Sequence, residues 1–290
     1  MMKRWLLFFA AAVILALHAE WWDGQFNWSG AQSVAPGIVY AQWKVSSPRL
    51  IRIHALRIDT HTPGLKFHVT GRDKDYGKPM PDAPDFVIRT KRQTTKSFTE
   101  NLIKQRIPVA VAFKSAPWSP WRAPFTHKYA DRMGMLISDG DVILPPDGRQ
   151  PSFIVTKKGK LDMVLLPANA KVSHIRHAVS GFSFVLIGGM VQPVDHKSLA
   201  PRTGFGLSKD KRYLYVFVAD GRQKNFSMGL THREVGMVLR FLGADCGLNM
   251  DGGGSTTMIV RRSGKPVMLN HQPKGAERPV GASVAVSVPR

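Results

Sequence analysis

Cysteine is nearly absent from this 290-residue chain, in which Cys246 is the only one. A single thiol excludes an intramolecular disulfide, and with it the small disulfide scaffolds and the zinc sites built on cysteine pairs. Glycine and proline occur 26 and 20 times, ordinary frequencies that exclude collagen-like and low-complexity chains. With 43% hydrophobic residues, a chain of this length can bury the core of one large domain or of two small ones.

Acidic residues are also scarce. The sequence has 20 Asp and Glu against 41 Lys and Arg, a formal net charge of +21. Such a surface attracts anions, which include nucleic acids, anionic glycans, phospholipid head groups and phosphorylated substrates. The scarcity narrows the search for catalytic carboxylates, because only four residues are glutamate. These are Glu20, Glu100, Glu234 and Glu277.

Beyond the N-terminus, no segment of the sequence is long and apolar enough to span a bilayer. A basic start, Met1 to Arg4, precedes thirteen apolar residues at 5–17, and Ala19 supplies a small residue for cleavage. The sequence therefore predicts a signal peptide at 1–19 and an exported protein, periplasmic or extracellular. An uncleaved signal anchor is the alternative, and it would be the sole membrane attachment. Export argues against a nucleic-acid partner and favours an anionic glycan or sugar phosphate of the cell envelope.

The remaining sequence divides into an irregular segment and one long patterned region. Residues 20–36, rich in Gly, Ser, Asn, Gln and aromatic residues, predict a linker or an N-terminal arm packed by its aromatic rings. Residues 37–290 predict one domain without internal repeats.

Alternating apolar and polar residues, together with turn dipeptides, predict that this domain is rich in strands. Strands are expected at 50–59, 109–113 and 213–219, and hairpins at the turns 139–140, 158–159 and 263–264. Helices are expected at 95–105 and 231–242, the second beginning with a capping box of Thr231 and Glu234. Strands with occasional helices and no regular β-α alternation predict an α+β fold. Its centre is expected to be a large, mainly antiparallel twisted sheet with a few packed helices.

One segment, GLNMDGGGSTTM at 247–258, stands apart from the rest of the sequence. Its three glycines allow the backbone to approach a ligand closely, so that N–H groups can bind an oxyanion while Asp251 supplies a carboxylate. A simple glycine-rich turn capped by Asp251 explains the spacing equally well. The segment is not a phosphate-binding P-loop, because no Gly-Lys-Ser/Thr follows the glycines.

Five motifs together resemble the phosphodiester glycosidase family. They are RTGFG at 202–206, ADGR at 219–222, MGLT at 228–231 with Glu234, NMDGGGSTTM at 249–258 and ERPV at 277–280. The resemblance implies hydrolysis of the glycosidic bond in a sugar-1-phosphodiester, which releases the free sugar and a phosphomonoester. Asp251, Asp220 and Glu234 are the candidate catalytic carboxylates. The candidate substrate-binding residues are Arg202, Arg222 and Arg278 as phosphate ligands, with Asn249, Gly252, Gly253, Gly254, Ser255 and Thr256. Glu234 also has a sufficient structural role in its capping box.

The chain departs from the family pattern near residue 112. Relatives usually carry an asparagine followed by small and aromatic residues where this chain has VAFKSAPW at 111–118, so Ala112 is expected to replace an active-site asparagine. Two alternative interpretations supply a replacement for the missing asparagine side chain. Lys114 brings a charge to the same place, or the loop 115–124 forms an aromatic platform with Trp118 and Trp121, which otherwise pack beneath the loop.

Other functions stay open from the sequence alone. A serine hydrolase at Ser255 is disfavoured, because no Gly-x-Ser-x-Gly motif surrounds it. A non-catalytic domain that binds an anionic cell-wall polysaccharide fits the net charge and the change at Ala112. The carboxylates show no dedicated ligand spacing, so no cofactor is predicted with certainty and a divalent cation is left open.

Overall fold

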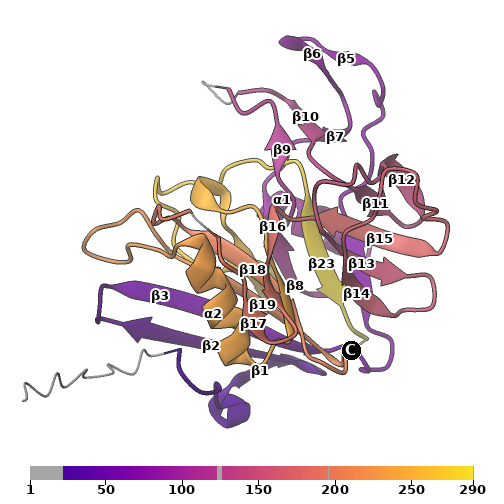
Figure 1. Cartoon of the computed structure of the whole chain (residues 1–290). Coiled ribbons are helices and arrows are strands. Elements are labelled where there is room, and N and C mark those ends of the chain that lie inside the picture. The colour runs from indigo at the N-terminus through magenta and orange to yellow at the C-terminus, as the bar shows by residue number, and fades with distance from the viewer. Residues whose placement is uncertain (1–21, 123–125, 195, 290) are drawn as a thin grey trace, which may run out of the picture.

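A computed structural model describes residues 22–122, 126–194 and 196–289 (Figure 1). The predicted signal peptide lies outside these residues. Every strand pair identified in the described ranges is antiparallel, and the same ranges contain two α-helices, which confirms the predicted α+β class. No helix in this part of the chain is long and apolar enough to cross a membrane.

Three larger sheets form the body of the molecule. The first has the order β1 (Gln32–Ala35), β2 (Ile38–Val45), β3 (Ile51–Asp59), β19 (Tyr213–Ala219), β18 (Arg202–Leu207), β20 (Cys246–Asn249), β16 (Ser183–Ile187) and β17 (Met190–Val191). The second has the order β22 (Lys265–Met268), β21 (Met258–Arg262), β8 (Val109–Lys114), β23 (Ser283–Ser287) and β4 (Lys66–Val69). The third has the order β12 (Asp141–Leu144), β11 (Leu136–Ser138), β15 (Ile175–Ser180), β13 (Ser152–Thr156) and β14 (Leu161–Val164).

Two small sheets lie at the upper end of the molecule in Figure 1. One contains β7 (Thr90–Lys91), β10 (Tyr129–Arg132) and β9 (Trp118–Ser119), and the other is the hairpin of β5 (Pro79–Met80) and β6 (Ala83–Val87). The eight-stranded first sheet is the large antiparallel sheet expected from the sequence, and the further sheets lie beside it.

The three larger sheets share one apolar core. Phe205 of β18 packs edge-on against Phe113 of β8, with ring centroids 5.1 Å apart, and against Phe153 of β13 at 5.9 Å. All three rings are buried. One side chain thus contacts all three sheets.

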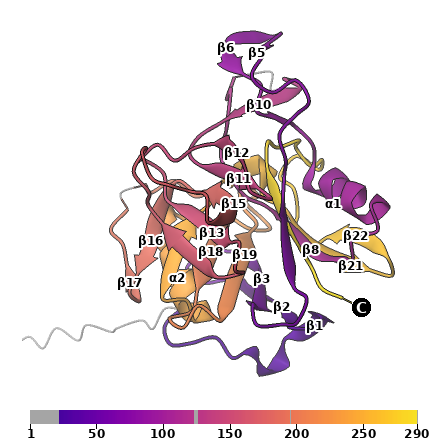
Figure 2. The same ribbon diagram turned by 90° about the vertical axis from the view of Figure 1, so that its right-hand side faces the viewer.

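Each helix covers the outer face of a sheet. Helix α1 (Thr95–Lys104) lies over the second sheet and packs Phe98 against Ile259 and Ala285 (Figure 2). Helix α2 (His232–Leu242) lies over the first sheet, where Val235 and Leu239 are fully buried. The capping box predicted for α2 is present, because the Thr231 side chain accepts from the backbone of Glu234 and the Glu234 side chain accepts from the backbone of Thr231.

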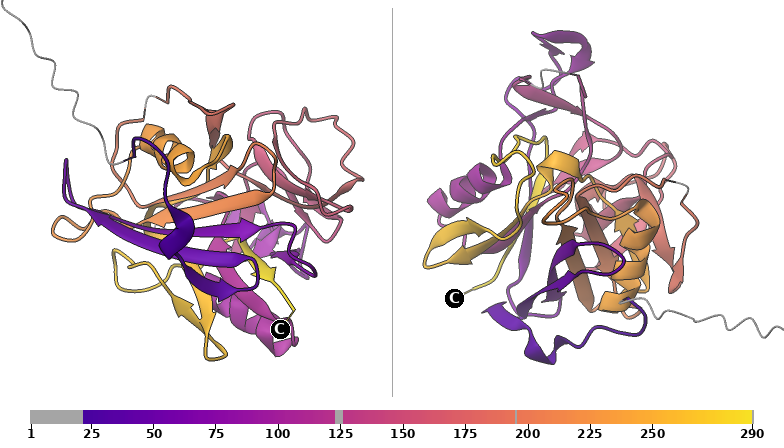
Figure 3. Two further views of the ribbon diagram at one scale, coloured as in Figure 1. Left: turned by 90° about the horizontal axis from the view of Figure 1, so that it is seen from below. Right: turned by 90° about the vertical axis from the view of Figure 1, so that its left-hand side faces the viewer.

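Residues 22–36 lie against the first sheet instead of extending from it (Figure 3). Phe26 stacks on Trp43 at 5.0 Å and meets Phe241 edge-on at 5.6 Å, and the Trp28 indole donates to the carbonyl of Leu242 at 3.1 Å. Strand β1 then pairs with β2. Aromatic packing thus ties this segment to α2 and to the sheet.

Candidate active site at the glycine-rich loop

The glycine-rich loop, residues 251–257, follows β20 where the first and second sheets meet. The Asp251 N–H donates to the carbonyl of Ser115 at 3.0 Å, and the Gly253 N–H donates to the carbonyl of Pro201 at 2.8 Å. These partners follow β8 of the second sheet and precede β18 of the first. Backbone hydrogen bonds to both sheets therefore fix the loop.

Glycine is required in this loop for contact and for conformation. A Cβ atom on Gly252 would lie 2.6 Å from the carbonyl oxygen of Pro201, closer than real Cβ contacts. Gly253 has φ +68°, a left-handed backbone that side chains rarely adopt. The sequence pattern therefore reflects a close backbone approach at 252 and a sharp turn at 253.

Asp251 forms an ion pair with Lys114. Lys114 is the last residue of β8 and its side chain is completely buried, whereas the Asp251 side chain is 16% exposed. The Lys114 Nζ donates to Asp251 Oδ2. A buried ammonium in contact with a carboxylate favours the ionised form of that carboxylate. Asp251 thus presents a fixed, partly exposed negative charge.

The expectation for Ala112 is wrong. Ala112 is fully buried in the apolar cluster beneath α1, with Phe98, Ile259 and Ala285 as neighbours. It lies in the middle of β8, and Lys114, two residues further along the strand, is the residue that reaches Asp251. The interpretation in which Lys114 brings a charge to the site agrees with the structure.

Two guanidinium groups lie directly on the loop glycines. A Cβ atom on Gly253 would be 3.5 Å from Nη1 of Arg222, and one on Gly254 would be 2.4 Å from Nη2 of Arg278. Arg222 is also a non-glycine residue with φ +60°, a strained conformation that clusters at functional sites. The structure therefore brings Arg222 and Arg278 together beside two adjacent glycines of the loop.

Arg202 is the third arginine of this group, and it is buried. Its Nε donates to the carbonyl of Leu230 at 2.9 Å, its Nη2 to the carbonyl of Ser198 at 2.8 Å and its Nη1 to Nε2 of His232 at 2.7 Å. Burial, reinforced by the charge of Arg222, lowers the pKa of Arg202 to about 10. Burial and the charge of Arg202 lower the pKa of His232 to about 4, so its ring is neutral at pH 7 and can accept.

The charges of Arg202 and Arg222 are not neutralised by an ion pair. Among the described residues, no carboxylate lies within 4.0 Å of either guanidinium. Each of the three neighbours that accept from Arg202 is a neutral group. Like charges held together without a counter-charge form a site that favours an anion.

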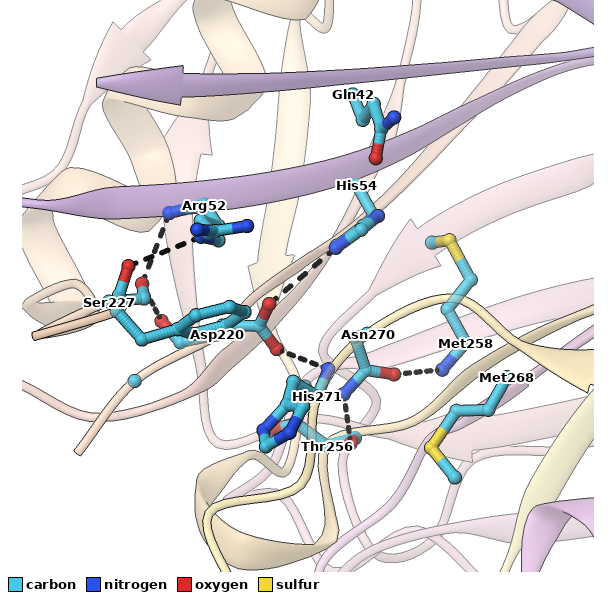
Figure 4. A network of polar contacts seen from close by, with 12 residues as sticks. Gln42, Arg52, His54, Asp220, Ser227, Thr256, Met258, Met268, Asn270 and His271 are labelled. Atoms are coloured by element: carbon cyan, nitrogen blue, oxygen red, sulfur yellow. Dashed lines mark hydrogen bonds and ion pairs between the residues drawn. The ribbon is translucent and has the colours of Figure 1, made fainter. Parts of the chain in front are cut away.

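Asp220 directly follows β19 and is 1% exposed. Figure 4 shows its carboxylate between His54 and the backbone of His271. Its Oδ1 accepts from the N–H of His271 at 2.8 Å, and its Oδ2 lies 3.5 Å from Nε2 of His54. His54 Nδ1 in turn lies 2.7 Å from the hydroxyl of Tyr40, whose pKa burial raises to about 12. The carboxylate of Asp220 is thus turned toward the sheet and the 270–271 turn.

The 270–271 turn holds the end of the glycine-rich loop. Asn270 accepts from the N–H of Met258 at 2.9 Å and donates to the carbonyl of Thr256 at 2.9 Å (Figure 4). The Asp220 carboxylate accepts from the backbone of His271, and Asn270, next to His271 in the chain, bonds to the loop. The position of Asp220 therefore affects the loop through these two residues.

Glu234 lies at the N-terminus of α2. Its Oε2 accepts from the Thr231 N–H at 2.8 Å and from Arg49 Nη2 at 2.5 Å. The side chain is 13% exposed. Both contacts belong to the helix cap and to a part-buried ion pair, and no identified contact joins Glu234 to the loop.

Several polar side chains around the loop are buried without a hydrogen-bond partner in the described ranges. Both side-chain atoms of Asn249 are in this state, as are the hydroxyls of Thr256, Thr203 and Ser115. An unsatisfied buried polar group costs about 1–3 kcal/mol. These groups are available to a bound ligand. Ser255 differs, because its hydroxyl donates to the carbonyl of Gly252 at 3.3 Å.

The two tryptophans near the site differ in environment. Trp118 is buried beneath Arg92, whose guanidinium lies 4.2 Å from the ring centroid. Trp121 is 57% exposed, with Arg278 4.9 Å from its ring. Of the two, Trp121 alone presents a ring to solvent beside the site.

In the described parts of the chain, no group of three or more His, Cys, Asp or Glu side chains could hold a metal ion. Near the loop, Asp251 is paired with Lys114, and the guanidinium groups of Arg222 and Arg278 lie beside Gly253 and Gly254.

Comparisons with known proteins agree with this geometry. A family model described as phosphodiester glycosidase matches residues 122–287. No curated protein matches the chain. The catalytic domain of zebrafish N-acetylglucosamine-1-phosphodiester α-N-acetylglucosaminidase, auto-inhibited by its pro-peptide, has a TM-score of 0.61 at 17% identity, with 90% of this chain and 86% of that chain covered.

Two further solved structures share the fold. A hypothetical protein from Synechocystis has a TM-score of 0.57 at 13% identity and covers 87% of this chain and 62% of its own. A putative exported protein from Burkholderia pseudomallei has a TM-score of 0.56 at 13% identity and covers 82% and 74%. At these identities the likeness concerns the fold alone.

Proposed function

Because the chain belongs to the phosphodiester glycosidase family, we propose that it hydrolyses the glycosidic bond of a sugar-1-phosphodiester. The products are a free sugar and a phosphomonoester. The substrate belongs to an anionic glycan or glycolipid of the cell envelope. The protein reaches it by export, for which residues 1–19 serve as the signal peptide. The family match and the fold support the reaction class, and the sequence supports the export.

The observation that carries the proposal is the group of arginines around the loop. Arg222 and Arg278 lie against Gly253 and Gly254, and Arg202 lies close enough to Arg222 for its pKa to be lowered. A phosphodiester brings the negative charge that Arg202 and Arg222 lack, and a guanidinium can bind it through two parallel hydrogen bonds. The phosphate therefore binds over the glycines, between Arg222 and Arg278.

Asp251 is the proposed catalytic carboxylate. Held in ionised form by Lys114, it stabilises the positive charge that develops at the anomeric carbon and orients the attacking water. The water oxygen bonds to the anomeric carbon while the bond from that carbon to the phosphate oxygen breaks. The electron pair leaves with the phosphate, and the proton of the water passes to Asp251 and then to solvent.

This reaction has little need of a second catalytic carboxylate. Ordinary glycosidases protonate a poor leaving group with a carboxylic acid, whereas a phosphomonoester has a second pKa of about 6 and departs as an anion. Asp220 and Glu234, the other carboxylates suggested by the sequence, are engaged in structural contacts. We assign both to positioning roles. Asp220 positions the loop, and Glu234 positions the N-terminus of α2.

An assay of released reducing sugar tests the proposal. The purified protein is expected to release N-acetylglucosamine or a related sugar from a sugar-1-phosphodiester, and Asp251→Asn is expected to release none. Tight binding of the phosphodiester without release would instead support the second candidate, a non-catalytic domain for anionic polysaccharide. The pairing of Asp251 with the Lys114 ammonium favours that candidate, because it occupies one of the two carboxylate oxygens.

A further inference from the structure

Two adjoining cavities open beside the turn of the β13–β14 hairpin. Their volumes are about 840 and 580 Å³. Both are lined by Thr60, Thr156, Gly159 and Leu161, so the hairpin forms the wall between them. The two cavities together are called the basic trench.

The basic trench lies at the far end of the first sheet from the glycine-rich loop. Asp210 and Lys211, which line it, lie just before β19 and are separated from it by Arg212, whereas Asp220 follows the last residue of that strand. A seven-residue strand is about 23 Å long, at 3.3 Å per residue. The trench is therefore separate from the candidate active site.

The trench is lined by an excess of cations. Its basic side chains are Lys158, Lys160 and Lys211 in the larger cavity and Lys66, Lys157 and Arg176 in the smaller one. Lys211 pairs with Asp162 at 2.7 Å and Arg176 with Asp139 at 2.9 Å. In the described parts of the chain, the four other ammonium groups have no carboxylate within 4.0 Å.

Uncompensated charges around a concave surface focus the electrostatic field. Each repels its neighbours, and this repulsion is relieved when a polyanion enters. Three of the four uncompensated lysines, Lys157, Lys158 and Lys160, lie within four residues on one hairpin. Such closely spaced cations suit a ligand with regularly spaced anions.

We propose that the basic trench binds a segment of a linear acidic polysaccharide, independently of the reaction at the glycine-rich loop. The lining combines these lysines with the hydroxyl of Thr60 and the carboxylate of Asp210, which suit sugar hydroxyls. No exposed large hydrophobic side chain of the described residues lines the trench, which disfavours insertion into a lipid surface. Its one Phe, Tyr or Trp ring is the buried Phe67, which disfavours stacking with unpaired bases.

Charge reversal on the hairpin tests the proposal. The trench variant is Lys157→Glu, Lys158→Glu and Lys160→Glu in one chain. The control variant is Lys44→Glu, Lys91→Glu and Lys265→Glu, three exposed lysines outside the trench with the same change in net charge. The probes are fluorescent polygalacturonate, which carries carboxylates, and fluorescent dextran phosphate, which carries phosphates.

The trench variant is expected to bind at least one of the two polymers about tenfold more weakly than the parent, and the control about threefold more weakly or less. Which polymer shows the loss distinguishes carboxylate from phosphate as the recognised group. Turnover of a small sugar-1-phosphodiester is expected to be unchanged in the trench variant. If the parent shows no turnover but the trench variant still loses polymer binding, the trench proposal is supported and only the proposed reaction is contradicted.

Three results would overturn the proposal. Equal losses in the trench and control variants would show that net charge alone attracts the polymer. Unchanged binding in the trench variant would place the polymer elsewhere. Stronger binding of single-stranded DNA or of anionic lipid vesicles through the same lysines would assign the trench to a different partner.

Discussion

Lys114 and Asp251, 137 residues apart in the chain, form an ion pair in which the lysine is completely buried and the aspartate reaches the surface. The pair joins the end of β8 to the glycine-rich loop. It explains why Lys114, a charged residue, ends a strand whose other residues are buried and apolar. It also gives the candidate site a fixed negative charge beside three arginines.

Asp251→Asn is expected to lower turnover of a sugar-1-phosphodiester by about 100-fold or more, because a charge is removed at the reacting carbon with little change in volume. Steady-state kinetics measure the effect. Circular dichroism and the melting temperature serve as controls for folding. Turnover within about threefold of the parent would remove Asp251 from the mechanism.

Lys114→Met is expected to destabilise the fold by roughly 3–5 kcal/mol, because it leaves a partly buried carboxylate without its counter-charge. Urea unfolding measures the loss. The matched control is Lys211→Met, which breaks the exposed pair with Asp162 and is expected to cost less than about 1 kcal/mol. Equal costs for the two variants would contradict the importance of the buried pair.

Gly254→Ala is expected to reduce kcat/KM by about tenfold or more, because the new methyl group would displace the guanidinium of Arg278 that lies on the loop. The control is Gly30→Ala, where no atom lies within 4 Å of the added Cβ. Activity measurements on both variants decide the matter. Full activity of Gly254→Ala would show that Arg278 does not need its present position.

Stability is expected to fall between pH 6.5 and 4 through His232. Its pKa is about 4 in the folded protein and about 6.5 when unfolded, so the unfolded chain binds more protons as the pH falls through this window. The contribution is fully present above pH 6.5, is lost as the pH falls to 4, and is reduced by solvent screening because His232 is only part-buried.

The variant His232→Gln keeps an acceptor for Arg202 without titrating in this range. Its unfolding free energy is expected to depend less on pH than that of the parent, while the exposed control His61→Gln changes nothing. His177, whose pKa burial also lowers to about 4, is present in all three proteins and cancels in the comparison. The same pH slope in parent and His232→Gln would contradict the prediction.

Arg222→Gln is expected to weaken binding of a sugar-1-phosphodiester by about tenfold and to reduce the dependence of binding on salt. A neutral glycoside of the same sugar is expected to bind weakly to both proteins. Calorimetric titration at two salt concentrations measures this. Equal affinities of the parent for the charged and neutral ligands at low salt would exclude the arginines as a phosphate site.

Local signals predicted much of the fold. The turns at 139–140 and 263–264 have positive φ at both positions, which suits Asp-Gly and Ser-Gly in tight hairpins. The strand expected at 213–219 is β19, and the capping box places the start of α2 correctly. Each of these features depends on residues a few positions apart.

The site was less predictable, because it is assembled by contacts between distant segments. Nothing local distinguishes Ala112, which faces α1, from Lys114, which reaches Asp251. The burial of Asp220 likewise depends on His54 and His271, more than 50 residues away on either side. The family resemblance pointed to this loop, but it could not separate the residues on its surface from those that support it.

The hydrogen bonds of the glycine-rich loop determine the stage of folding at which the candidate site can be complete. The loop is tied to Ser115 from one sheet and to Pro201 from another, so neither sheet alone can give it its shape. A partly folded chain with both sheets formed but not docked would hold no ordered site. The candidate site is therefore complete only once the two sheets have docked.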